Sequence, residues 1–77
     1  MSADLSAFFR PHGVAVIGAS RDPQKLGHAV VRNLIDCRYG GGIYPVNPRA
    51  ESVLEHQGYV SARDVPDPVD LAIVIVP

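Results

Sequence analysis

The chain has 77 residues, of which 47% are hydrophobic, and its 7 Lys plus Arg and 8 Asp plus Glu give a formal net charge of -1. This balance gives no support to a nucleic-acid or membrane-surface protein, and no segment approaches the ~20 apolar residues of a membrane span. The single cysteine, Cys37, excludes an internal disulfide framework and predicts a cytoplasmic protein with a buried helical thiol.

The N-terminal half predicts the start of a βαβ unit. A short helical turn is expected within Met1 to Arg10. The stretch from Gly13 to Gly27, GVAVIGASRDPQKLG, then predicts a buried parallel strand, a tight turn at Gly18 and an amphipathic helix from Leu26. Backbone N–H groups at the start of such a helix, together with its dipole, favour an anion, usually a phosphate.

The predicted helix has a broad apolar face and is expected to end at the glycines Gly40 to Gly42. Asp22 before Pro23 predicts a preliminary capped turn. His28 is expected on the helix surface, with a ligand contact as the less favoured alternative. The apolar positions are Leu26, Ala29, Val30, Val31, Leu34, Ile35 and Cys37.

A second strand is predicted over Ile43 to Val46. Pro45 within it cannot donate to the ladder, a conflict that an outward-facing position would resolve. The polar stretch from Arg49 to Gly58 predicts a loop with at most one helical turn, and Tyr59-Val60 predicts a very short third strand.

The C-terminal part predicts one more helical turn and one more strand. Ser61 lies three residues before Asp64, the spacing of an N-terminal capping pair. The run from Asp70 to Val76, DLAIVIV, is apolar on both faces and predicts a central strand. An exposed apolar face on it would favour dimerisation or aggregation of the isolated segment, so a homo-oligomer stays open.

These elements predict an α/β fold, a Rossmann-like doubly wound parallel sheet that is incomplete. Only one long helix is predicted, so residues 1–77 are expected to be the front part of a larger domain, or half of an assembly. The second and last long strands should flank the first, which brings three carboxyl ends together as a ligand site. These ends are Gly18-Ala19-Ser20, Val46-Asn47-Pro48 and Val76-Pro77.

The residues narrow the choice of nucleotide without settling it. The G-x-G-x-x-G fingerprint is absent, because the next glycine after Gly18 is Gly27, nine positions on. No Asp or Glu directly follows the second strand to accept ribose hydroxyls; Asn47, Pro48 and Arg49 stand there instead. A cation at this place suits an extra ribose phosphate, so both NADP and coenzyme A qualify. The basic candidates are Arg21, Lys25 and Arg49.

The motifs together resemble a known family, the N-terminal CoA-binding domain of NDP-forming acyl-CoA synthetases, which includes the ADP-forming acetyl-CoA synthetases and the α subunit of succinyl-CoA synthetase. The likeness extends from Phe8 to Pro77. It is carried by GVAVIGAS, the P-x-K-x-G of Pro23, Lys25 and Gly27, Asn33-Leu34, GGIYPVNPR and DVPDPVDLAIVIVP. The stretch from Leu54 to Tyr59 departs from the family, which has Leu-Gly there, and predicts a more exposed loop.

The resemblance implies a role in binding CoA or acyl-CoA. It places Gly18, Ala19, Ser20, Lys25 and Gly27 along the CoA nucleotide, Asn47, Pro48 and Arg49 at its adenosine end, and Val76-Pro77 where the site closes. It assigns the phosphorylated His, ATP or ADP and Mg²⁺ to domains or subunits outside this segment. No catalytic or metal-binding residue is therefore expected here, and His12, His28 and His56 do not match the family histidine.

Three hypotheses follow. The first is the CoA-binding segment of an NDP-forming acyl-CoA synthetase, an acid-thiol ligase. The second is a non-catalytic CoA or acyl-CoA sensor, as in fusions with a lysine acetyltransferase. The third is an NADP-binding oxidoreductase domain, which Arg49 and the general fold favour.

Overall fold

The computed structural model describes residues 12–76. They form three strands, one α-helix and one 3-10 turn, in the order β1 (Gly13–Ile17), α2 (Leu26–Asp36), β2 (Gly42–Val46), η1 (Ala62–Asp64) and β3 (Leu71–Val74). The helical turn predicted within Met1 to Arg10 lies outside the described residues, as does Pro77.

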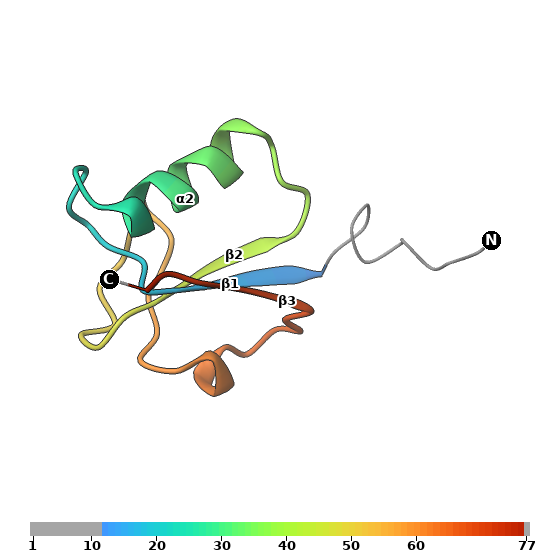
Figure 1. Cartoon of the computed structure of the whole chain (residues 1–77). Coiled ribbons are helices and arrows are strands. Elements are labelled where there is room, and N and C mark those ends of the chain that lie inside the picture. The colour runs from blue at the N-terminus through green and yellow to red at the C-terminus, as the bar shows by residue number, and fades with distance from the viewer. Residues whose placement is uncertain (1–11, 77) are drawn as a thin grey trace.

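The sheet is parallel throughout, with strand order β2-β1-β3. Val14 of β1 pairs with Ile43 on one side and with Leu71 on the other. Helix α2 lies over one face of the sheet, and the segment containing η1 runs on the opposite side (Figure 1). The predicted Rossmann-like partial fold and its strand order are therefore confirmed.

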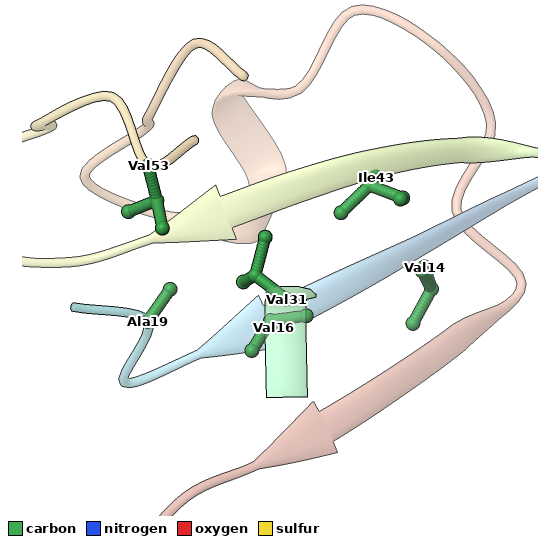
Figure 2. Packing of buried hydrophobic residues seen from close by; sticks show 6 residues of the cluster. All are labelled: Val14, Val16, Ala19, Val31, Ile43 and Val53. Carbon is green, nitrogen blue, oxygen red and sulfur yellow. The ribbon is translucent and has the colours of Figure 1, made fainter. Parts of the chain in front are cut away.

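The core lies between α2 and the first two strands. Figure 2 shows Val31 of the helix over Val16, with Val14 and Ile43 in the same layer, and each of these side chains is buried. Val53, from the loop after β2, is also fully buried. Each such valine contributes on the order of 1.5–3 kcal/mol on burial, so this layer fixes the start of α2 relative to the ends of β1 and β2.

Helix α2 ends earlier than predicted. The chain leaves it through Arg38, whose φ of 57° is left-handed, and the N–H of Tyr39 donates to the carbonyl of Leu34 at 3.0 Å. This is a Schellman-type end with Arg in the place usual for glycine. The prediction that Gly40 to Gly42 stop the helix is wrong, and Cys37, predicted to be buried, is exposed just past the helix end.

Pro45 is accommodated as predicted. The Pro45 carbonyl faces away from β1 and accepts the N–H of Tyr59 at 2.9 Å, so the missing N–H falls on that outer side. The strand predicted at Tyr59-Val60 is reduced to one bridge between Tyr59 and Val46. The outer edge of β2 is thus covered by a single residue pair.

The loop after β2 contains a tight turn where one helical turn was allowed. Val53 and His56 exchange backbone hydrogen bonds of 2.9 and 3.0 Å. Between them, Leu54 and Glu55 have φ values of 50° and 71°, both left-handed. The helical alternative is wrong because two consecutive left-handed residues build a type I′-like turn.

The helical turn predicted near the C-terminal end is confirmed, and the central place of the last strand stays a prediction. The one-turn helix after Ser61 is present as η1, and Ser61 Oγ accepts the N–H of Arg63 at 3.3 Å. Strand β3, predicted to be central, lies at the edge of the described sheet. Leu71 and Val74 are accordingly 42% and 61% exposed, since no described element packs against β3 from outside.

Candidate functional site

The carboxyl ends of the strands meet at one end of the sheet, beside the start of α2 (Figure 1). A hollow of about 310 Å³ lies between the chain that leaves β1 and the chain that leaves β2. Its lining is Gly18, Ala19, Ser20, Lys25, Asn47, Pro48, Arg49 and Glu51. The structure thus brings together seven residues that the sequence predicted for the site, and adds Glu51.

The turn after β1 is built on close backbone approach. Gly18 has a φ of +97°, and its N–H donates to the carbonyl of Val46 at 2.9 Å, which ties the turn to β2. At Gly27, a Cβ atom would lie 2.1 Å from the Gly18 carbonyl oxygen and 3.0 Å from the Ala19 Cα. Only glycine therefore allows α2 to begin directly against this turn.

Several backbone N–H groups at this junction lack an acceptor in the described part of the chain. Within residues 12–76, the N–H groups of Ala19, Ser20, Leu26 and Gly27 have no protein acceptor. Those of Leu26 and Gly27 open α2, where the helix dipole adds partial positive charge. Lys25 stands just before them as the N-cap residue, so the junction suits an anion such as a phosphate.

Asn47 shapes the second wall of the hollow. The residue is 8% exposed, and its Oδ1 accepts the N–H groups of Arg49 at 3.2 Å and Glu51 at 2.8 Å. Its Nδ2 donates to the Glu51 carbonyl at 2.9 Å. The amide is therefore engaged with its own loop, while Pro48 and Arg49 are exposed.

A second hollow, of about 410 Å³, adjoins the first through Gly18 and Lys25. Its other lining residues are Leu26, Gly27, Ile75 and Val76. The N–H of Ile75 donates to the carbonyl of Ile17 at 2.8 Å, which carries the chain past the end of β1. The predicted site residues Gly27 and Val76 lie here, and Pro77 lies outside the described residues.

Sequence reasoning missed Leu26, Glu51, Ile75 and His28. Leu26 was placed on the buried face of the helix, yet it is 64% exposed at the hollow. The sequence did contain a signal for Leu26, because it is a large apolar residue in the first helical turn, beside the predicted phosphate site. His28 was expected on the helix surface and is instead 6% exposed. The prediction of a surface position is wrong because the first turn of α2 packs against the turn after β1, and His28 lies on that inner face.

Two side chains with shifted pKa values, Asp70 and Tyr44, lie at the opposite end of the sheet from the hollows. The Asp70 carboxylate accepts the N–H of His12 at 3.1 Å and that of Gly13 at 3.2 Å, and these hydrogen bonds hold its pKa below the ordinary value. Burial, followed by a hydrogen bond to Asp67, raises the pKa of Tyr44. Both groups are near the strand starts and stabilise the fold there.

Neither a metal centre nor a membrane helix occurs in the described part of the chain. No three His, Cys, Asp or Glu side chains between residues 12 and 76 are close enough to hold a metal ion. No helix over the same residues is sufficiently long and apolar to cross a membrane.

Residues 12–77 match the family described as the CoA binding domain. The chain belongs to this CoA-binding domain family. It is 52% identical over 73 residues to the alpha subunit of ADP-forming acetate–CoA ligase II from Pyrococcus furiosus, an alignment that covers 95% of the chain and 16% of that subunit. The chain thus spans about a sixth of this relative.

The fold of the chain is also similar to those of solved structures. Acetyl-coenzyme A synthetase 1 of Candidatus Korarchaeum cryptofilum superposes with a TM-score of 0.86 at 43% identity, over 96% of the chain and 16% of the synthetase. A hypothetical protein from Pyrococcus horikoshii OT3 gives a TM-score of 0.79 at 32% identity, over 92% of the chain and 49% of that protein. The resemblance noted in the sequence is confirmed: the chain is homologous to the CoA-binding domain of ADP-forming acetyl-CoA synthetases.

Proposed function

We propose that the chain forms the front part of the CoA-binding domain of an NDP-forming acyl-CoA synthetase, and that CoA binds in the two adjoining hollows. ATP or ADP, Mg²⁺ and the acyl-transfer chemistry belong to other domains or subunits of that enzyme. The observation that carries the proposal is the junction of β1 and α2, where Ala19 and Ser20, whose N–H groups have no acceptor within residues 12–76, line the same hollow as Lys25 and Arg49.

The charges of this hollow suit the nucleotide of CoA. The free N–H groups and Lys25 offer donors and positive charge to a pyrophosphate. Arg49 follows β2, where the 3′-phosphate of an adenosine ribose would lie, and its guanidinium can form charge-assisted hydrogen bonds to phosphate. The second hollow has an apolar wall of Leu26, Ile75 and Val76, which suits a less polar arm of the same ligand.

Calorimetric titration of the full-length protein tests this proposal. We expect CoA to bind more tightly than dephospho-CoA and NADPH. Arg49→Ala should remove most of the preference for CoA over dephospho-CoA, and Lys25→Ala should weaken both, each by about tenfold as for hydrogen bonds to charged groups. Arg63→Ala removes another exposed cation, on η1 and outside the lining of the hollow, and is the matched control.

Three outcomes would redirect the assignment. Tight NADPH binding with weak CoA binding would favour an oxidoreductase domain. CoA binding by a protein that forms no thioester from CoA, nucleotide, Mg²⁺ and any of a panel of acids would favour a CoA or acyl-CoA sensor. No binding of CoA by the folded protein would refute the CoA site itself.

A further inference from the structure

His28 is the buried polar side chain of α2 for which phosphate binding gives no direct role. The residue is 6% exposed, and its Nδ1 lies 3.0 Å from the carbonyl oxygen of Ser20. A carbonyl oxygen only accepts, so Nδ1 carries the hydrogen and donates it. Nε2 is then an acceptor, and it is buried without a partner among residues 12–76.

Packing alone does not account for a histidine here. A buried polar atom without a partner costs stability, and an aliphatic side chain would fill the space without that cost. The single polar contact of the imidazole is with Ser20, which lines the proposed nucleotide hollow. The Ser20 contact is therefore the feature that distinguishes histidine from an apolar residue at this position.

The contact fixes one peptide of the turn after β1. Ser20 Oγ accepts the N–H of Asp22 at 3.0 Å, and the Ser20 carbonyl accepts from His28, so the hydroxyl oxygen and the carbonyl oxygen of the residue are both held. In a trans peptide the carbonyl and the following N–H point in opposite directions. Rotation of this peptide, which joins Ser20 to Arg21, would break the contact with His28 and change the course of the turn that lines the hollow.

We infer that His28 is a positioning residue: as the Nδ1–H imidazole it holds the Ser20 carbonyl against α2 and keeps the turn from Gly18 to Ser20 in the form that receives the phosphates of CoA. The inference rests on the proposed function, because it takes CoA as the ligand. His28 does not itself touch the ligand in this arrangement.

A matched pair of substitutions in the full-length protein tests the role of Nδ1. Asn presents its side-chain amide near the place of Nδ1, whereas Gln presents it near the place of Nε2. We expect His28→Asn to bind CoA within about threefold of the wild type, and His28→Gln and His28→Ala to bind it about five- to tenfold more weakly, the range of one hydrogen bond. Asn33→Ala, on the exposed side of α2, is the control.

Nitrogen-15 NMR of the histidine ring provides a readout that needs neither a variant nor a ligand. We expect the Nδ1–H tautomer at His28; an Nε2–H tautomer would overturn the inference even if a substituted protein failed to fold. Equal CoA affinity for the Asn and Gln variants would overturn it as well. A wild-type protein that shows the Nδ1–H signal yet binds no CoA would refute the proposed function, and would leave the Ser20 contact as a purely structural one.

Discussion

Replacing Gly27 by alanine should damage both the fold and the site, although alanine is the better helix former. The added Cβ would lie 2.1 Å from the Gly18 carbonyl oxygen, about 1 Å short of a normal contact. Its second neighbour, the Ala19 Cα at 3.0 Å, is also backbone. No side chain can rotate away, so relief requires the start of α2 to move off the turn after β1.

The change in local stability caused by Gly27→Ala is the sum of two opposing effects. Overpacking of this kind costs about 1–3 kcal/mol, and the rigid backbone neighbours favour the upper part of that range. Alanine returns at most about 1 kcal/mol of helix propensity relative to glycine. We therefore expect a net loss of about 1–2 kcal/mol in local stability, and weaker CoA binding because the N–H groups of α2 move relative to Ser20.

Native-state hydrogen exchange at the amides of β1 and α2 in the full-length protein measures the first effect, and CoA titration measures the second. Gly40→Ala is the matched control, since a Cβ there meets no atom within 4 Å and its φ is not left-handed. That variant should be unchanged or stabilised by up to about 1 kcal/mol. Exchange rates and CoA affinity that are the same in the two variants would refute the reasoning.

Three further substitutions, one of them a control, test the fold away from the site. Glu55→Gly should stabilise the 53–56 turn by up to about 1 kcal/mol, because Glu55 has a φ of 71°, and should slow amide exchange at His56. The control Gln57→Gly, at an exposed position without positive φ, should instead cost about 0.5 kcal/mol of stability. Equal effects of the two substitutions would contradict this explanation. The lowered pKa of Asp70 means that its stabilising contribution is complete above the ordinary carboxyl pKa and is lost as the pH falls through the lower folded-state value. Asp70→Asn should therefore flatten the acid-induced loss of amide protection at Gly13 below about pH 4, and an unchanged pH profile would argue against this role.

The sequence was sufficient for the sheet order and for the place where the strand ends meet. Val14 to Ile17 and Ile43 to Val46 are short apolar runs, and right-handed crossovers leave few arrangements for them. Parallel strands then bring their carboxyl ends to one edge, so Gly18 and Asn47 meet across it whatever the side chains do. Position in the chain was thus enough to predict these contacts.

The errors arose where tertiary contacts override local preference. The chain leaves helix α2 through Arg38, which adopts the left-handed conformation that the sequence prediction expected only of glycine. Hydrogen bonds at the helix end compensate the free-energy cost of this conformation. Leu54 and Glu55 likewise adopt left-handed conformations without being glycine. They form the tight turn that follows Val53, whose side chain is fully buried. His28 was placed by helical periodicity alone, which cannot anticipate a turn packed against the first helical residues.

The two uncharged polar side chains that line the hollow from opposite walls, Ser20 and Asn47, both hydrogen-bond to the protein's own backbone, and this limits which groups can discriminate between ligands. Ser20 accepts hydrogen bonds at its Oγ and its carbonyl, and the Asn47 amide is bonded to its own loop. Their main effect is to fix backbone shape. Lys25 and Arg49 are exposed cations on the same hollow. If the proposed site is correct, the backbone sets where a phosphate binds, and these two cations determine how many phosphates the preferred ligand carries.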